Sequence, residues 1–411
     1  MVPDLSRILA LATYLDDPQL SYPTIHVTGT NGKGTAARVA TSVACAHGLT
    51  TGLYTSPHLE SVTERLSVCE VDMTEAEFAD EYTHLEPFLE LVDGRSEERV
   101  TYFEALTALA YLWFADKPVA LGVFEVGMGG TWDATNLVSG DVAVITPIGL
   151  DHPELGSTIT EVAGEKAGIV KDGKIAVVRE QHPDALGVLE TRCDQVGASM
   201  LLEFREWEVL ERLQAVGGQA FAMQGTHASY DELYLPLFGE HAVRNAAAAI
   251  VACEQILGEP LDAERLREGL AAIRWPGRLE VVSRQPAIVL DGAHNPAGAE
   301  ALAEALGESF TWERLHLVLS ISANKDVAGI IEPLAPVADA AYATRNQSER
   351  AGDTASIAGA FAEHGTPLTV HGTVEEALDA ARDAASDADL ICVTGSLYTV
   401  ADARRALGVT T

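Results

Sequence analysis

The chain has 411 residues, which at about 150 residues per domain corresponds to two or three domains. Its 47% hydrophobic and 21% charged residues exclude a disordered or fibrous protein, and its apolar runs stop well short of the roughly 18 residues that a membrane span needs. The 61 acidic residues outnumber the 27 basic ones, and without a basic cluster the net charge of −34 argues against nucleic acid or a membrane surface as a partner.

The first twenty residues contain Asp4, Asp16 and Asp17 and lack a basic segment followed by an apolar one. No secretory signal is therefore expected, and the protein is predicted to be cytoplasmic. Only six lysines accompany 21 arginines and the many acids, a composition that favours adaptation to very high salt. An ordinary acidic mesophilic protein is the alternative. A monomer is expected, because no heptad or sustained apolar edge segment is found.

Short apolar runs bounded by Gly or Pro alternate with amphipathic stretches, which indicates an α/β protein with a mostly parallel sheet. Strands are expected at residues 24–28, 120–126, 141–147, 175–178, 287–290, 315–320, 338–343 and 390–394. Helices are expected at residues 35–47, 102–115, 159–170, 244–256, 263–273, 297–306, 374–385 and 400–406. Shorter strand-like pieces between residues 200 and 240 flank a turn at Gly217 and Gly218.

A domain boundary is expected within residues 275–286, where a helical run ends and a new alternation of strand and helix begins. This predicts an N-terminal domain of residues 1–280 and a smaller C-terminal domain of residues 281–411. The five cysteines lie far apart and form no C-x-x-C pair, so neither a zinc site nor a disulfide framework is expected. They are interpreted as small buried apolar residues: Cys45, Cys69, Cys193, Cys253 and Cys392.

Residues 24–35 combine an expected strand, a turn of sequence G-T-N-G-K-G-T and the start of an expected helix. This order supplies backbone N–H groups and the positive end of a helix dipole to a polyphosphate. Lys33 would neutralise charge on the β- and γ-phosphates, and Thr35 would reach Mg²⁺. The generic Walker pattern is not met, because Val27 occupies its first glycine position and Gly34 follows the lysine. A glycine-rich turn with an incidental lysine is the alternative interpretation.

This loop resembles the nucleotide loop of folylpolyglutamate synthase/dihydrofolate synthase, a branch of the Mur ligase superfamily. Further segments match that family in order across nearly the whole chain: residues 54–59, 101–104, 124–130, 133–136, 149–152, 164–169, 275–278, 291–296, 325–327 and 395–398. The resemblance implies a P-loop ATPase domain with a mostly parallel sheet and a smaller Rossmann-like α/β domain. It also implies that ATP is bound by Thr30, Asn31, Gly32, Lys33, Gly34, Thr35, Arg278, Asp291, His294 and Asn295.

Two Mg²⁺ sites follow from the same resemblance, with Ser56 and Glu125 on one ion and His152 on the other. Glu125 closes the apolar run 119–124, so its carboxylate is expected at the carboxyl end of a buried parallel strand, where α/β sheets bind ligands. Taken alone, His152 is interpreted as a capping or core histidine. Lys166 alone is interpreted as a solvated helix lysine, but the matching family lysine is carbamylated and engages the second metal. The resemblance is also compatible with a bound monovalent cation.

Catalytic roles are therefore assigned by resemblance to Lys33, Lys166 and His152. Arg278 would contact the ATP phosphates and Asp291 the nucleotide, whereas spacing alone favours an exposed linker arginine and a strand-end turn. The family positions that line the pterin part of the acceptor correspond to Thr101, Phe103, Asp133, Thr135 and Asn136. Without the resemblance, Phe103 is interpreted as a core residue of an amphipathic helix and residues 133–136 as a polar turn.

The predicted function is an ATP-dependent amide ligase that activates a folate or dihydropteroate carboxylate as an acyl phosphate and joins it to L-glutamate. Its partners would be small molecules. The match begins at residues 5–8, which predicts that an upstream stretch that helps hold the pterin is short or missing. Thr131 and Trp132 replace a more usual Arg-Leu, and residues 346–351 match only loosely. These departures leave dihydropteroate use and the glutamate side open.

Two alternatives remain at this point. One is a Mur-type ligase that acts on a different acid. The other is a nucleotide-binding regulatory or scaffold protein without ligase chemistry.

Overall fold

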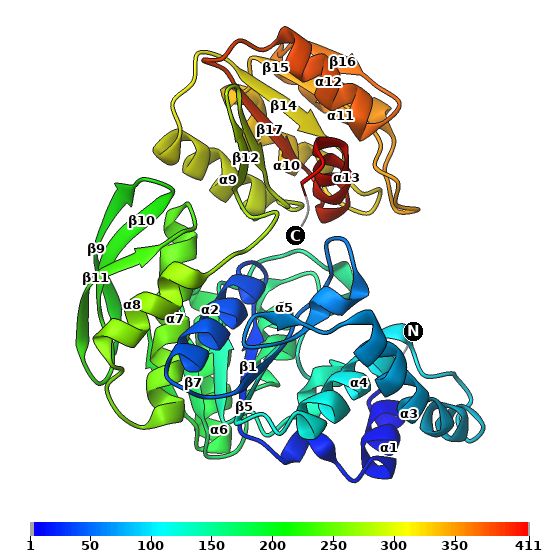
Figure 1. Ribbon diagram of the computed structural model, residues 1–411, viewed down its shortest axis with the longest axis vertical. Coiled ribbons are helices and arrows are strands. Elements are labelled where there is room, and N and C mark those ends of the chain that lie inside the picture. The colour runs from blue at the N-terminus through cyan, green and yellow to red at the C-terminus, as the bar shows by residue number, and fades with distance from the viewer. Residues whose placement is uncertain (1–3, 410–411) are drawn as a thin grey trace. The chain divides into compact units, whose positions relative to one another are not determined.

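The computed structural model describes residues 4–409, which form two compact units (Figure 1). The first unit runs to Ile273 apart from residues 214–218 and 237–241, and the second comprises those short segments and the chain from Arg274. Within the described residues, no helix is both long and apolar enough to cross a bilayer. Each unit is an α/β structure built on a mostly parallel sheet, as the sequence predicts.

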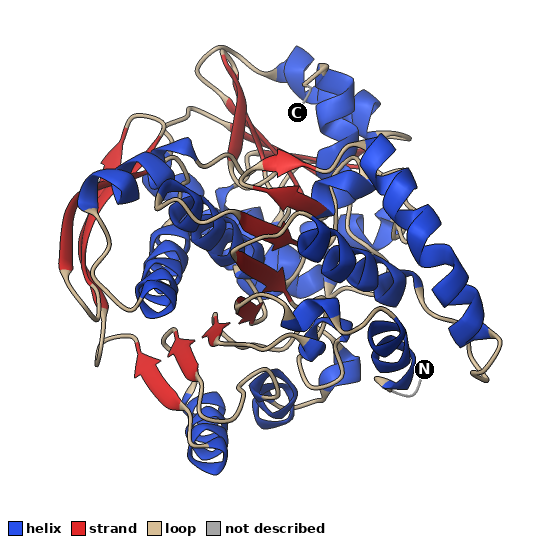
Figure 2. Ribbon diagram, turned by 60° about the horizontal axis from the view of Figure 1, so that its bottom comes forward, coloured by secondary structure: helices blue, strands red, loops and turns tan. Residues whose placement is uncertain are grey.

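The first unit contains an eight-stranded sheet in the order β4-β3-β2-β5-β1-β6-β7-β8. Its strands are β1 (Thr24–Thr28), β2 (Thr51–Tyr54), β3 (Leu66–Val68), β4 (Val71–Asp72), β5 (Leu121–Glu125), β6 (Val142–Ile145), β7 (Ile175–Val178) and β8 (Ser199–Leu202). The pairs from β2 to β8 are parallel, and β3 and β4 add an antiparallel edge. Helices lie on both faces, which is why β1 and β5 are buried along their whole length (Figure 2).

Helices α1 (Ser6–Tyr14), α3 (Glu75–Asp93) and α4 (Tyr102–Asp116) share an apolar core with residues of β2, β3 and β5. Helices α5 (Ile159–Ala167) and α6 (Pro183–Val196) share a second core with residues of β6 and β7. Helix α2 (Lys33–Ala46) packs on β1, β2 and β5 and against α8 (Ala263–Ala272), and α7 (Glu240–Leu257) is buried over most of its length. A separate sheet joins β9 (Glu208–Ala215), β10 (Gly218–Gln224) and β11 (Ser229–Leu235).

The second unit contains a six-stranded sheet in the order β12-β13-β17-β14-β15-β16. Only the edge pair of β12 and β13 is antiparallel in this sheet. Its strands are β12 (Glu280–Arg284), β13 (Ala287–Leu290), β14 (Leu315–Leu319), β15 (Ala340–Ala343), β16 (Leu368–Val370) and β17 (Leu390–Thr394). Its helices are α9 (Pro296–Ser309), α10 (Val327–Leu334), α11 (Thr354–His364), α12 (Val374–Ala384) and α13 (Leu397–Leu407).

The expected central strands are all present, and β1, β7, β13 and β17 begin and end where the sequence predicts. Helix α3 was not among the helices expected from the sequence, and its 19 residues bury only Glu81, Leu85 and Val92. A helix that covers little of the core needs no wide apolar stripe. Short edge strands such as β4 are likewise invisible in the sequence, because tertiary pairing rather than a local pattern forms them.

One prediction about the cysteines is wrong. Cys45 and Cys69 form a disulfide with their Cα atoms 5.6 Å apart, whereas Cys193, Cys253 and Cys392 are buried free thiols as expected. Cys45 lies in the last turn of α2, and Cys69 lies in the turn between β3 and β4. The antiparallel pairing of β2 with β3 returns the chain to the end of α2, and a 24-residue separation in sequence gives no sign of this.

Candidate active site

The glycine-rich loop follows β1 at the carboxyl end of the parallel strands, and the chain enters α2 from it. Gly29 has a φ of 145°, and a Cβ at this position would lie 1.8 Å from the hydroxyl oxygen of Thr146. Gly32 caps α2 with a φ of 83°, and a Cβ there would lie 2.1 Å from the side-chain nitrogen of Asn245. Only glycine can adopt this backbone and fit between these neighbours.

Hydrogen bonds fix the loop to the segment that follows β6. The Thr30 N–H donates to the carbonyl of Pro147 at 2.9 Å, and the Thr30 hydroxyl donates to the carbonyl of Gly149 at 2.9 Å. The Thr146 hydroxyl donates to the carbonyl of Asn31 at 2.7 Å. The N-terminus of α2 is thus held rigidly beside the neighbouring strand ends, an arrangement that can bind phosphate.

Two lysines reach this loop. Lys33 begins α2, and its ammonium donates to the carbonyls of Gly29 at 3.2 Å and Thr30 at 3.1 Å. Lys166 projects from α5 and is only 4% exposed, with its Nζ donating to the carbonyl of Gly29 at 2.7 Å. Burial, reinforced by the charge of Lys33, lowers the pKa of Lys166 to about 7. Lys166 is therefore not a solvated helix lysine.

Ser56 and Glu125 come together at the ends of the paired strands β2 and β5. The Ser56 N–H donates to Oε2 of Glu125 at 3.1 Å, and the carboxylate is only 6% exposed. A carboxylate and a hydroxyl oxygen are hard ligands of the kind that Mg²⁺ takes, so these two residues fit the predicted ion. His152 lies in the loop after β6 with its Nε2 3.4 Å from a carboxylate oxygen of Asp151, and imidazole is a softer ligand.

Thr101 and Phe103 lie at the N-terminus of α4. Thr101 is the N-cap and exchanges hydrogen bonds with Glu104 in a capping box, which fixes where the helix begins. The ring of Phe103 is half-buried and contacts the ring of Tyr54, with 6.1 Å between the ring centroids. A Cβ on Gly127 would lie 2.5 Å from the Phe103 ring, so the chain after β5 passes directly against it.

The predicted residues Asp133, Thr135 and Asn136 hold the turn after β5 in shape. Asp133 accepts hydrogen bonds from the backbone of Met128 at 2.9 Å and Thr135 at 3.0 Å, and burial raises its pKa. Thr135 is completely buried against His26, and the Asn136 amide donates to backbone carbonyls. These contacts suit residues that position a binding surface.

In the second unit, Asp291 follows β13 and accepts hydrogen bonds from the backbone N–H groups of Leu279 at 3.0 Å and Ala293 at 2.8 Å. Burial raises the pKa of Asp291, and the charge of Arg278 acts in the opposite direction. Asn295 is buried and caps α9 through the Gly298 N–H. Nδ1 of His294 lies 2.8 Å from the carbonyl oxygen of Gly292. Arg278, Asp291, His294 and Asn295 thus surround one turn.

Sequence reasoning did not find Thr146, Asp151 or Asn245, which support the loop and His152. Asn245 is a polar residue within the long apolar run of α7, and this pattern was the available signal. Its side-chain oxygen accepts a hydrogen bond from Arg179 at 2.6 Å, which holds the amide against Gly32. Thr146 and Asp151 lie next to expected elements and carry no such signal.

Residues 27–253 match the Mur ligase middle domain, and residues 277–397 match the Mur ligase glutamate ligase domain. The dihydrofolate synthase/folylpolyglutamate synthase of Mycobacterium tuberculosis is 42% identical over 99% of this chain and 90% of its own length.

Among solved structures, the folylpolyglutamate synthase of M. tuberculosis in complex with ADP and AMPPCP has a TM-score of 0.96 and 41% identity, over 99% of this chain and 96% of its own. An FPGS–AMPPCP–folate complex has a TM-score of 0.89 and 35% identity, over 99% and 95% of the two chains. The chain therefore belongs to the dihydrofolate synthase/folylpolyglutamate synthase family of Mur ligases.

Proposed function

We propose that this protein is an ATP-dependent carboxylate–amine ligase that joins the carboxylate of a folate to the amine of L-glutamate. The observation that carries the proposal is the loop from β1 to α2, which places Lys33 at a helix N-terminus beside the carboxyl ends of parallel strands. Its membership of a family that includes a protein solved with AMPPCP and folate supports the same acceptor and the same nucleotide.

The reaction has two steps. A carboxylate oxygen of the acceptor attacks the γ-phosphorus of ATP, the bond to ADP breaks, and an acyl phosphate forms. The glutamate amine then attacks the acyl carbon, phosphate leaves, and the amine proton passes to solvent. Lys33 and the N-terminus of α2 stabilise negative charge on the transferring phosphoryl group, so catalysis consists mainly of positioning and charge neutralisation.

Residues of this chain could also hold divalent cations, which would complete this charge balance. Ser56 and Glu125 would hold one Mg²⁺ and His152 would contribute to a second, and Mg²⁺ supplies positive charge to the phosphate oxygens. The candidate ligands are oxygen atoms of the Glu125 carboxylate and the Ser56 hydroxyl, and the bond from the Ser56 N–H to Oε2 holds the two residues side by side.

Lys166 would carry a carbamate. An uncharged amine is the form that reacts with carbon dioxide, and the lowered pKa of Lys166, about 7, makes that form abundant near neutral pH. The carbamate would be an anion next to the second cation. This role explains why a lysine is retained at a buried position in a chain with only six lysines.

The second unit would contribute Arg278 to the ATP phosphates and Asp291, His294 and Asn295 to the nucleotide. Their support is that Asp291, His294 and Asn295 lie in the turn after β13 and that Arg278 lies beside it, with a guanidinium nitrogen 3.3 Å from where a Cβ on Gly292 would be. The acceptor would contact Phe103 near the start of α4. Thr101, Asp133, Thr135 and Asn136 would act mainly by holding the surrounding backbone, because their side chains are engaged in hydrogen bonds.

The direct test is release of ADP in molar KCl with ATP, Mg²⁺ and L-glutamate, using tetrahydrofolate or dihydropteroate as the acceptor. Turnover with both acceptors supports a bifunctional enzyme, and turnover with tetrahydrofolate alone supports a folylpolyglutamate synthase. ADP release that requires neither acceptor nor glutamate would contradict a ligase. Turnover with a different acid only would assign the chain to another Mur-type reaction.

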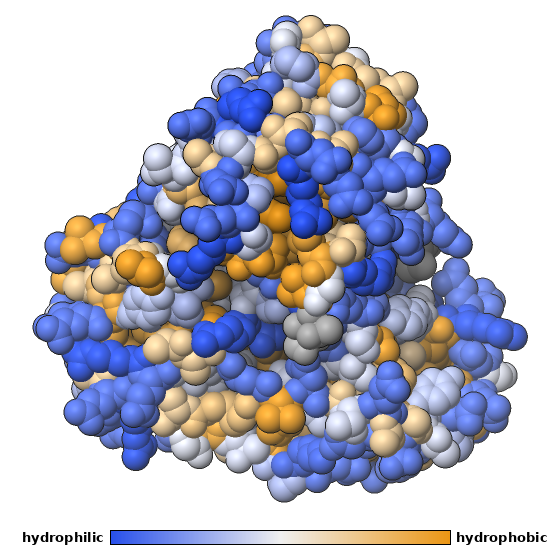
Figure 3. All heavy atoms as spheres, turned by 45° about the horizontal axis from the view of Figure 1, so that its top comes forward, coloured by the Kyte–Doolittle hydropathy of each residue, from blue (hydrophilic) through white to orange (hydrophobic). Residues whose placement is uncertain are grey.

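The charge composition further suggests a protein adapted to high salt. Hydrophilic side chains cover most of the face drawn in Figure 3, in a chain whose acids exceed its bases by 34. Salt screens repulsion among these acids, so the melting temperature is expected to rise steadily from 0.1 M to molar KCl. A melting temperature that falls or stays constant over this range would contradict the adaptation.

A further inference from the structure

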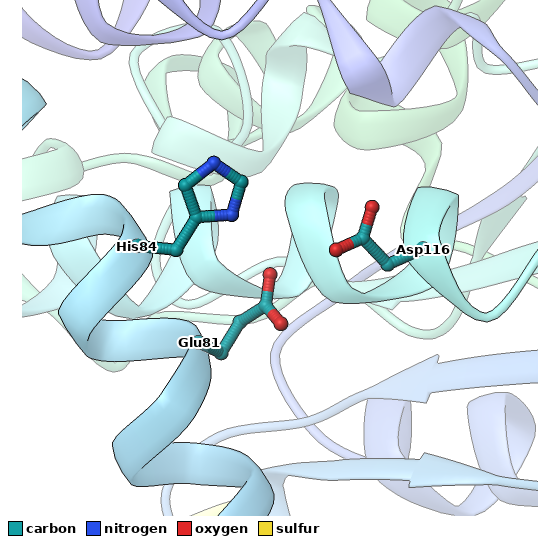
Figure 4. A group of neighbouring side chains, drawn as sticks. All are labelled: Glu81, His84 and Asp116. Atoms are coloured by element: carbon teal, nitrogen blue, oxygen red, sulfur yellow. The ribbon is translucent and has the colours of Figure 1, made fainter.

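A second group of side chains able to bind a metal lies between α3 and α4. Glu81 and His84 are three residues apart on α3 and therefore lie on one face of that helix, and Asp116 is the last residue of α4. One ligand atom from each residue lies within 4.8 Å of the other two. Figure 4 shows the three side chains extending from the two helices toward one another.

One oxygen of the Glu81 carboxylate in this group receives no hydrogen bond from the described residues. Glu81 is only 9% exposed, and within residues 4–409 its Oε1 is shielded from solvent and has no hydrogen-bond partner. Lys117 is the nearby cation, but its ammonium binds Glu77 at 2.7 Å. A buried carboxylate oxygen without a donor is costly, so its presence in a native site needs an explanation.

The charges around Glu81 are mostly negative. Burial, with additional repulsion from Asp116 and Asp80, raises the pKa of Glu81 to about 7, and Lys117 acts against this rise. A divalent cation would compensate Glu81 and Asp116 together.

We propose that Glu81, His84 and Asp116 form a binding site for a divalent transition-metal cation of the Zn²⁺ type. One imidazole nitrogen and two carboxylate oxygens are ligands that Zn²⁺ commonly takes, and the imidazole favours it over Mg²⁺ or Ca²⁺. Zn²⁺ bonds of about 2.0–2.2 Å require the ligand atoms to approach one another more closely than 4.8 Å. Small side-chain rotations of the exposed His84 and Asp116 can supply this movement, and water can occupy the fourth position.

The ring of Phe88 helps to orient the histidine. Phe88 lies one helical turn after His84, and its ring meets the imidazole edge-on with 6.3 Å between the centroids. The histidine is thus held on the side of α3 that faces Asp116, while Glu81 approaches from below the same face (Figure 4).

The site has a structural role that is independent of the ligase reaction. Asp116 ends α4, whereas Thr101 and Phe103 lie at its beginning, and a 15-residue helix separates its two ends by about 20 Å. A cation bound here would join the end of α4 to the middle of α3. Its expected effect is therefore on the stability of the first unit.

The proposal is tested on the full chain after treatment with a chelator and dialysis. Zn²⁺ is titrated calorimetrically in the presence of 10 mM Mg²⁺, which occupies hard oxygen sites. The expected result is one Zn²⁺ site that H84N and D116N each weaken about tenfold or more, since loss of even an outer-shell partner weakens metal binding by 10–100-fold. Zn²⁺ should also raise the melting temperature of the wild type and leave that of H84N unchanged.

His182→Asn is the matched control, because His182 is a half-exposed histidine 3.7 Å from one carboxylate, that of Asp184. H182N should retain the Zn²⁺ site of the wild type. Because His84 and Asp116 are exposed, their variants are expected to fold, and circular dichroism checks this. The proposal is overturned if H84N binds Zn²⁺ like the wild type, or if the wild type binds no Zn²⁺ in the presence of Mg²⁺.

Discussion

Lys33 and Lys166 donate hydrogen bonds to the same oxygen atom, the carbonyl of Gly29, at 3.2 and 2.7 Å. They come from different helices, α2 and α5, and are 133 residues apart in the sequence. Two ammonium groups at one carbonyl repel each other, and the charge of Lys33 contributes to the lowered pKa of Lys166. The glycine-rich loop therefore couples the lysine that begins α2 to a lysine that is poised to lose its charge.

Replacement of Lys33 by alanine is expected to abolish ADP formation, because no other side chain begins α2 with a positive charge. The folded structure should persist, since Lys33 is half-buried and its ammonium donates to carbonyls of its own loop. Lys174→Ala, which removes a half-exposed lysine paired with Asp141 at 2.7 Å, is the control and should keep its activity. Wild-type turnover by K33A would refute the assignment of the nucleotide loop.

Replacement of Lys166 by methionine should stabilise the protein more at pH 6 than at pH 9. The folded pKa of Lys166, about 7, lies below the ordinary lysine value of 10.5, so between these values the unfolded chain binds more protons than the folded one. Wild-type stability therefore carries the full cost of the buried ammonium below pH 7 and recovers as pH rises. The recovery from pH 6 to 9 amounts to about 2–3 kcal/mol at ~1.4 kcal/mol per pH unit.

This prediction is measured by denaturant unfolding of wild type and K166M at both pH values in buffer free of carbon dioxide, so that Lys166 carries no carbamate. Because the hydrogen bond to Gly29 is lost equally at either pH, only the difference between the two pH values reports on the charge. An equal effect of K166M at pH 6 and pH 9 would show that the Lys166 pKa is not lowered.

Replacement of Gly29 by alanine should destabilise the first unit and abolish ADP release. The added Cβ would lie 1.8 Å from the Thr146 hydroxyl, so Thr146 would have to give up its hydrogen bond to Asn31. Gly173→Ala is the matched control, because Gly173 also has a positive φ, 67°, but a Cβ there would meet nothing within 4 Å.

G173A should cost only about 1–2 kcal/mol for the left-handed backbone and keep its activity. Thermal unfolding and ADP release are compared for both variants. If G29A proves as stable and active as G173A, the loop does not depend on the close approach of Thr146.

Replacement of Glu125 by alanine should eliminate turnover at millimolar Mg²⁺. The change removes a buried carboxylate and leaves the Ser56 N–H without the oxygen at 3.1 Å. If Glu125 acts only as a metal ligand, raising Mg²⁺ should recover part of the activity. Steady-state ADP release over a range of Mg²⁺ concentrations measures this, with the exposed Glu154→Ala as the control. Unchanged turnover of E125A at low Mg²⁺ would exclude a role in metal binding.

The sequence by itself determined the features that depend on neighbouring residues along the chain. The alternation of apolar runs and amphipathic stretches predicted β1, β5, β6 and most of the second unit's strands. The glycine-rich turn could be predicted because its features lie within seven consecutive residues. These are the positive φ angles at Gly29 and Gly32 and the start of α2 at Lys33. The family resemblance rests on further short motifs of the same local kind.

Only the tertiary structure decided which distant residues meet. The burial of Lys166 against Gly29, the disulfide from Cys45 to Cys69 and the group formed by Glu81, His84 and Asp116 each join separate elements. Local sequence patterns do not predict such contacts, because the packing of helices on a sheet brings these side chains together. The same packing removes them from water, and this desolvation turns an ordinary lysine or glutamate into a group with a shifted pKa.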